Sequence, residues 1–445
     1  MPHQFSPFQI LVLFYFAAVS ISAFLLSLPI FHQPGVDFSM MDAIFTAVSA
    51  VSVTGLTVVS IVDTFNPLGT FVLLFIIQIG GIGLMTISTF IWLILGKKIG
   101  LKERQLIMAD QNQSSLAGLV ELMKQILYLI LAIEAVGFFI LGTYYLTYFP
   151  TAAEAFYHAM FATISATTNT GFDITGQSLI PFAHDYFVQI VHMMLMILGA
   201  IGFPVLIEVK RYFQHRRKHA YPYRFSLFAK LTTSTYFILV IAGFLLFLLI
   251  ENDGLFAGKV WHDRLFASLF QSVTSRSSGL TTFDVSELTL ASQFVLIILM
   301  FIGASPSSVG GGIRTTTFAV ILLAIYFFAK GRNSIKVFHR EIHHEDVTKA
   351  FVVASVAILL FVSSVCFLAY TEPFTLTEIM FEAASAFGTC GLSLGITPEL
   401  STSGKIVIMI LMFIGRIGIV TLLFLIRGKG IKEPYHYPKE RVIIG

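Results

Sequence analysis

Long apolar stretches alternate with short polar ones along the chain, and eight of the apolar stretches are long enough to cross a lipid bilayer. A membrane-spanning helix needs about 20 predominantly apolar residues. The pattern predicts eight full spans, at residues 8–30, 71–95, 125–148, 186–209, 232–251, 291–329, 350–371 and 405–427. The sixth stretch is too long for one simple crossing. Because helices satisfy their own backbone hydrogen bonds in lipid, the chain is predicted to be an all-α polytopic membrane protein.

Four shorter stretches, each following an odd-numbered span, are apolar but rich in hydroxyl groups and end at a glycine. They read "FTAVSAVSVTGLT" (45–57), "FATISATTNTGFD" (161–173), "LFQSVTSRSSGLT" (269–281) and "FEAASAFGTCGLS" (381–393). Each predicts a half-length helix that enters from the outer side and stops at a turn. One Thr-Gly or Ser-Gly pair alone is an ordinary turn signal. The final glycines, Gly55, Gly171, Gly279 and Gly391, are 116, 108 and 112 residues apart, so the four copies indicate an internal repeat.

The repeating unit is span, half-helix, turn and span, and it sets the expected organisation of the chain. The four repeats are predicted at residues 1–96, 125–209, 232–329 and 349–427, with linkers at 97–124, 210–231 and 330–348 and a tail at 428–445. A second matched set of glycines lies in the even-numbered spans, at Gly80, Gly199, Gly303 and Gly415. The prediction is a pseudo-fourfold arrangement around a central pore, built from eight spans and four re-entrant half-helices.

The turn after each half-helix carries the candidate chemistry. Non-helical backbone at membrane depth is tolerated where it lines a water-filled cavity or is buried in protein. Rings of backbone carbonyls replace the hydration shell of a potassium ion, and glycine permits the dihedral angles that such turns need. The predicted selectivity filter therefore comprises Val53, Thr54, Gly55, Asn169, Thr170, Gly171, Ser277, Ser278, Gly279, Thr389, Cys390 and Gly391.

The sixth span is interrupted by "GASPSSVGGGIRTTT" (303–317), which contains Pro306 and the glycine run Gly310, Gly311 and Gly312. Proline removes a helix donor, and each glycine costs about 1 kcal/mol relative to alanine in a helix. The pattern predicts a loop at residues 304–317, at membrane depth below the third turn, whose small polar residues can swing aside, as a gate requires. The alternative is a kinked helix with a glycine-packed face.

Three arginines lie within apolar or half-length segments. An arginine inside a membrane bundle is costly and usually pairs with another group or faces water. Arg416 is expected to border the cavity under the filter and to tether carbonyls of the gate loop; the alternative is a helix-end arginine that reaches the interface. Arg276 is expected to brace the third turn from behind, with Glu382 as a guessed partner. The sequence leaves the role of Arg314 open.

Charge and composition fix the class and orientation of the protein. The chain has 56% hydrophobic and 12% charged residues, which excludes an ordinary soluble domain. Most lysines and arginines fall at 97–124, 210–230, 330–349 and 427–441, so the positive-inside rule predicts that both termini are cytoplasmic. The basic loop at 211–224 is interpreted either as an anchor on anionic membrane lipids or as a docking site for a regulatory partner.

Other functional classes find little support in the sequence. No P-loop and no dinucleotide-binding glycine motif occurs, so no bound nucleotide is expected in this chain and nucleotide sensing would need another polypeptide. No paired catalytic groups, metal site or nucleic-acid motif is expected. Glu134 and Glu208 could indicate a proton-coupled carrier, but hydrogen bonds between helices are favoured. An alternating-access secondary cation carrier would show a twofold rather than a fourfold period.

The four filter glycines and the "RSSGLTTFD" segment (276–284) also carry a family resemblance. The whole chain resembles the Trk/Ktr/HKT superfamily of potassium transporters, most closely the KtrB type of membrane subunit in bacterial Ktr systems. Glycine at all four positions is similar to potassium-permeable members, whereas serine at the position of Gly55 marks sodium-preferring plant relatives.

The resemblance implies a channel-like potassium uptake protein in the bacterial plasma membrane, with an intramembrane gate. It further implies a homodimer, a cytosolic ring of KtrA-like nucleotide-binding regulatory subunits and assistance by sodium. A sodium-permeable relative remains the alternative.

Overall fold

The computed structural model describes residues 6–95, 99–110, 118–218, 222–332 and 334–427, together with five positions of the C-terminal tail (435, 437, 438, 440 and 443). Within these residues the fold is almost entirely helical; the exception is a small hairpin of β1 (Lys336–Val337) and β2 (Arg340–Glu341). Most of the predicted tail at 428–445, and Lys97 and Lys98 of the first predicted linker, lie outside the described residues.

The first unit shows how the sequence sets helix boundaries. Helix α1 (Pro7–Leu26) begins with a capping box at Ser6, and its proline occupies the first turn, where no N–H is needed. The short helix α2 (Met40–Ser52) begins with a second capping box, formed by Ser39 and Asp42. After α3 (Ile61–Thr64), the apolar run continues as α4 (Pro67–Ile82) and α5 (Leu84–Ile94).

The same order recurs three times. The second set comprises α7 (Leu119–Tyr145), α8 (Ala152–Thr167), α9 (Tyr186–Ala200) and α10 (Phe203–Lys218). The third comprises α11 (Leu227–Ile250), α12 (Trp261–Thr274), α13 (Leu290–Ile302) and α14 (Thr315–Ala329). The fourth comprises α15 (His344–Thr371), α16 (Leu376–Gly388), α17 (Thr402–Ile417) and α18 (Ile419–Arg427). Helix α6 (Leu101–Asp110) and the 3-10 turns η1 (Pro29–Phe31), η2 (Ile180–Phe182) and η3 (Val285–Glu287) complete the described elements.

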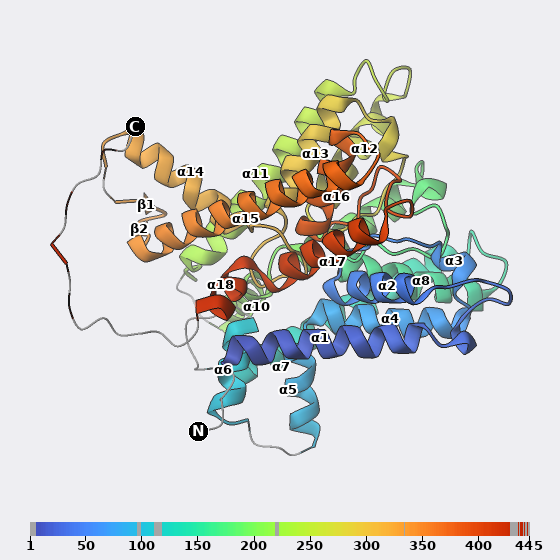
Figure 1. Cartoon of the computed structure of the whole chain (residues 1–445), viewed down its shortest axis with the longest axis horizontal. Coiled ribbons are helices and arrows are strands. Elements are labelled where there is room, and N and C mark those ends of the chain that lie inside the picture. The colour runs from blue at the N-terminus through green and yellow to red at the C-terminus, as the bar shows by residue number, and fades with distance from the viewer. Residues whose placement is uncertain are drawn as a thin grey trace.

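Among the described residues, four helices are long and apolar enough to cross a membrane, namely α1, α7, α11 and α15, and seven spans result if each bent pair counts as one. The predicted second, fourth and eighth spans are not continuous helices, which corrects the sequence-based expectation. They bend by 100°, 102° and 97°. The bends fall at Gly83, Gly202 and Gly418, whose positive φ angles of 94°, 101° and 83° a helix cannot contain. Figure 1 shows the bend between α4 and α5 as two blue helices that are almost perpendicular.

The four units pack against one another in a closed ring. The short helix of each unit packs against the helix that follows the turn in a neighbouring unit: α8 against α4, α12 against α9, α16 against α13, and α2 against α17. The last contact brings the C-terminal unit back to the N-terminal one, and Figure 1 shows α17 (red) beside α2 (blue). The short helices are therefore the shared core, while the long helices expose apolar residues such as Phe16, Leu249 and Tyr370 on the outside.

Candidate ion pathway

The chain leaves each short helix through a turn whose residues are buried at the centre of the molecule. Thr54, Thr170, Ser278 and Cys390 are each at most 1% exposed. In the first, second and fourth turns the residue two places before the glycine has a positive φ: 59° at Val53, 52° at Asn169 and 47° at Thr389. The following glycines all have φ between 74° and 94°. This left-handed backbone turns the chain sharply out of the helix.

The four turns meet one another in a ring. A Cβ atom built on any of the four glycines would come closer than 3.0 Å to a carbonyl oxygen of the next turn, a separation that real Cβ atoms essentially never show. The contacts run from Gly55 to Thr170, from Gly171 to Ser278, from Gly279 to Cys390 and from Gly391 to Thr54. Four segments that are far apart in sequence therefore close a circle, and only glycine fits at its joints.

Hydroxyl groups on the short helices hold these turns from behind. The Oγ atom of Ser49 accepts a hydrogen bond from the Gly55 N–H at 3.0 Å, and that of Ser385 accepts from the Gly391 N–H at 3.1 Å. Ser165, the matching residue of the second unit, donates to the Phe172 carbonyl at 2.6 Å. Sequence reasoning missed these residues, although serine six places before the glycine in three of the four copies was a readable signal.

The second set of matched glycines allows the backbones to approach closely. A Cβ atom on Gly80, Gly199 or Gly415 would collide with carbonyl oxygens at the end of the short helix of the same unit. Gly303 differs, because its collision is with the carbonyl of Gly311 in the interrupted sixth span. The third unit therefore places a loop of its own where the other three units place the end of a short helix.

A loop rather than a kinked helix joins α13 and α14, as the glycine and proline pattern predicts, but it covers residues 303–314 rather than 304–317, because α14 already begins at Thr315. The Gly312 N–H donates to the Phe387 carbonyl at 3.2 Å. At the other end of the loop, the Ser307 carbonyl accepts a hydrogen bond from the Phe203 N–H at 2.8 Å, and Pro306 lies against Gly202. The loop therefore lies between the turns of the third and fourth units and the break of the second unit.

Two arginines contact the carbonyl oxygens of this loop. Arg416 donates to Val309 and, on its other side, to Gly80. Arg314 donates to Gly310 and, at 3.4 Å, to Ser305. Both guanidinium groups also line a polar pocket where all four interrupted spans meet, together with Gly83, Phe203, Ser307 and Ile417. Positive charge at this position opposes the entry of a cation.

Arg276 lies deeper and is only 1% exposed. Its guanidinium group donates to the Leu299 carbonyl, close to the C-terminal end of α13. The guessed partner is wrong, because Glu382 accepts hydrogen bonds from Ser393, at 2.7 Å, and from Thr397. Both hydroxyls belong to the segment that follows the fourth turn, so the carboxylate faces its own unit.

The two carboxylates that raised the possibility of a proton-coupled carrier bond between helices. Glu134 on α7 accepts from the Gln78 amide on α4 at 2.7 Å. Glu208 on α10 accepts from the N–H and the hydroxyl of Ser226, the capping residue of α11, at 3.0 and 2.5 Å. Each is a local contact between neighbouring elements, which favours the interpretation as hydrogen bonds between helices.

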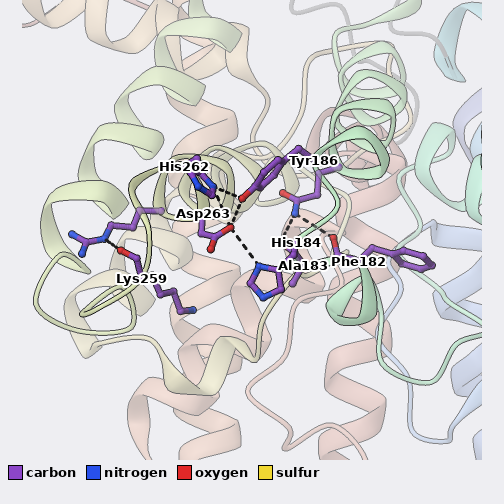
Figure 2. Close-up of polar contacts among 9 residues, drawn as sticks. Phe182, Ala183, His184, Tyr186, Lys259, His262 and Asp263 are labelled. Carbon is purple, nitrogen blue, oxygen red and sulfur yellow. Dashed lines mark hydrogen bonds and ion pairs between the residues drawn. The ribbon is translucent and has the colours of Figure 1, made fainter. Parts of the chain in front are cut away.

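A polar cluster joins the second and third units where α9 and α12 begin (Figure 2). The hydroxyl of Tyr186 donates to Asp263, and the His184 ring nitrogen lies 3.4 Å from the same carboxylate oxygen. The His262 ring nitrogen contacts the Tyr186 hydroxyl and lies 3.7 Å from the same carboxylate oxygen of Asp263. The hydrogen bond from Tyr186 lowers the pKa of Asp263, so this carboxylate stays ionised at neutral pH.

Comparison with known proteins agrees with this architecture. A family model for TrkH, described as a cation transport protein, matches residues 4–430. The Ktr system potassium uptake protein D of Bacillus subtilis (strain 168) is 59% identical over 442 residues, which cover 99% of this chain and 97% of that protein. The Ktr system potassium uptake protein B of the same organism is 37% identical over 444 residues, covering 99% and 97%.

A solved structure has the same fold. The potassium transporter TrkH from Vibrio parahaemolyticus superposes with a TM-score of 0.73 at 20% identity, over 96% of this chain and 86% of that one. Because the family model and both relatives extend over nearly the whole sequence, the chain belongs to the TrkH family of cation transport proteins, and it is a multi-pass membrane ion transporter rather than an enzyme.

Proposed function

We propose that the chain is the ion-translocating subunit of a potassium uptake system, and that its four converging turns are the selectivity filter. The observation that carries this proposal is the ring in which each turn glycine faces a carbonyl of the next turn. Carbonyl oxygens held in a ring can replace the hydration shell of an alkali cation without any carboxylate. The names of the two Bacillus subtilis relatives, both potassium uptake proteins, support potassium as the ion.

The short helices add an electrostatic contribution. Each of α2, α8, α12 and α16 ends directly at its turn, so four helix C-termini surround the ring. A helix C-terminus carries the equivalent of roughly half a negative charge. Capping boxes with Asp42 and Glu378 place negative side chains at the opposite, N-terminal ends of α2 and α16. In our proposal the four units are pseudo-fourfold repeats, and their helix dipoles favour a dehydrated cation at the centre.

The loop at 303–314 is the proposed gate. Pro306 and the glycines from Gly310 to Gly312 give it an irregular backbone that lies directly beneath the third and fourth turns. Arg416 holds the loop through the Val309 carbonyl. In the closed conformation the loop and the two guanidinium groups lie across the route of a cation that leaves the filter; opening requires the loop to move aside and Arg416 to release it.

Regulation and assembly follow from the family resemblance. We infer that the chain forms a homodimer in the bacterial plasma membrane, with both termini cytoplasmic, and that a ring of KtrA-like nucleotide-binding subunits opens the gate. Two relatives that are named as Ktr system proteins support this partner class. Sodium assistance is part of the same proposal, and a sodium-permeable transporter is the second candidate.

Uptake by a bacterial strain that lacks its own potassium transporters tests the function. The full chain, expressed with and without a cognate regulatory subunit, should restore growth on low potassium. Purified protein in liposomes should carry potassium down an imposed gradient, with flux that depends little on a proton gradient. Absence of potassium flux in liposomes, with and without the regulatory subunit, would refute the proposal, whereas equal sodium and potassium flux would favour the sodium-permeable alternative.

A further inference from the structure

The ring of four turns is not uniform, because one of its joints has additional links. Between the third and fourth turns, the Ser277 hydroxyl donates to the Thr389 carbonyl at 3.1 Å. At the same joint the Cys390 thiol contacts the Thr274 carbonyl at 3.5 Å. All four residues are at most 1% exposed. These side-chain hydrogen bonds between neighbouring turns make Ser277 and Cys390 sensitive to any displacement of the third turn against the fourth.

The gate loop lies directly against the same joint. A Cβ atom on Gly310 would collide with both the Oγ and the Cβ of Ser277, and one on Gly311 would lie 2.7 Å from the Thr389 side chain. The adjacent N–H of Gly312 donates to the carbonyl of Phe387, two residues before Thr389. The loop therefore packs closely against the third and fourth turns, and a side chain at Gly310 or Gly311 would displace it from them.

A buried arginine links the joint to the start of the loop. Arg276 precedes Ser277 in the third turn and donates to the Leu299 carbonyl on α13. Helix α13 ends at Ile302, and the loop starts at the next residue. A movement of the loop is thus transmitted to the third turn by two routes, through direct contact at Gly310 and through the end of α13.

We propose that the loop, when packed against the third and fourth turns, sets the geometry of the joint between them, so that opening the gate weakens the discrimination of potassium from sodium. Ser277 is the positioning residue in this coupling, since its hydroxyl bonds the fourth turn while its side chain contacts the loop. The inference rests on the filter and gate proposed above. It predicts that flux and selectivity change together, because both depend on one packed contact.

The test measures potassium and sodium uptake rates of purified full-length variants in liposomes, without a regulatory partner. Gly310→Ala should raise potassium flux about tenfold, equivalent to about 1.4 kcal/mol in favour of the open gate, and should lower the potassium-to-sodium flux ratio. Gly100→Ala is the matched control, because Gly100 is exposed and meets only the Glu103 side chain.

Ser277→Ala is an independent test, because it does not depend on whether the protein folds with a side chain at Gly310. It keeps the Cβ but removes the bond to Thr389, and it should raise flux and lower the ion ratio together. A lower ratio with unchanged flux in Ser277→Ala, or a higher flux with an unchanged ratio in Gly310→Ala, would overturn the coupling while leaving filter and gate intact. If both variants keep wild-type flux and ratio, the coupling is refuted and so is the gate; absence of potassium flux in every protein, including wild type, would instead refute the proposed function.

Discussion

Replacing Gly55 by serine should weaken potassium selectivity more than the same change at any other turn glycine. The residue has a φ of 88°, which L-residues with a side chain rarely adopt, and its built Cβ makes the closest of the four approaches to a neighbouring carbonyl, that of Thr170. For the Cβ to reach 3.0 Å, the Thr170 carbonyl must retreat by about 1.2 Å, far more than a packed core absorbs without strain.

The distance by which the neighbouring carbonyl must move sets the expected order of effect among the four glycine-to-serine variants. It is smaller at Gly171, against Ser278, and smaller again at Gly279 and Gly391, at about 0.6 Å each. If the carbonyls of this ring replace water around the ion, a displaced carbonyl removes part of the discrimination, and we expect the potassium-to-sodium permeability ratio of Gly55→Ser to fall about tenfold, or about 1.4 kcal/mol.

The assay is the ratio of potassium to sodium flux into liposomes under matched gradients, with Gly100→Ser as a control at an exposed glycine. Size-exclusion elution of each variant shows whether the protein has folded. Unchanged ratios in all four folded variants would refute the assignment of the filter. A larger effect at Gly391 than at Gly55 would refute the reasoning from displacement but not the filter itself.

Two further predictions concern charged groups. Arg416→Gln should raise potassium flux in liposomes without a regulatory partner, because the loop loses a charged donor at Val309, a contact worth about 1.5–3 kcal/mol. Wild-type flux in this variant would contradict the prediction, and Arg264→Gln, at an arginine in the first turn of α12, is the control. Asp263→Asn tests the polar cluster where α9 and α12 begin. Since the hydrogen bond from Tyr186 lowers the pKa of Asp263, this contact stabilises the protein above the ordinary carboxyl pKa and is lost below about pH 4. The melting temperature of the wild type should therefore fall more steeply with acid than that of the variant. Parallel acid profiles of the two proteins would show that the cluster adds no pH-dependent stability.

The sequence predicted the order of elements well because hydrophobic length and turn chemistry are local properties. The short helices and the loop interrupting the sixth span both follow from nearby residues, as with Pro306 and the glycine run. The convergence of the turns was predictable only through repetition: one Thr-Gly pair says nothing about where a turn lies in space, whereas four matched pairs require a common environment.

The sequence did not reveal the bends in the second, fourth and eighth spans or the partners of the buried charges. Gly83, Gly202 and Gly418 occur in apolar runs that also suit a continuous helix, and only tertiary packing decides that the backbone breaks there. The partner of Arg276 is likewise invisible, because a backbone carbonyl such as that of Leu299 is present at every residue and carries no sequence signal. Glu382 was the obvious carboxylate by type, yet its Oε1 accepts hydrogen bonds from the nearer hydroxyls of Ser393 and Thr397.

In our proposal, the departure of the third unit from the pattern of the other three at this position explains how a ring of similar units holds one gate. In three units a span glycine, as at Gly80, lies against the end of a short helix, so that space is filled by a rigid element. In the third unit Gly303 lies against the loop instead, and the fourth unit supplies Arg416, which bridges from the loop to the first unit. A symmetric chain would need four such loops to move in concert. In our proposal, confining irregular backbone to one unit means that a regulatory partner opens the pathway by displacing one segment, while the first and second turns keep their shape.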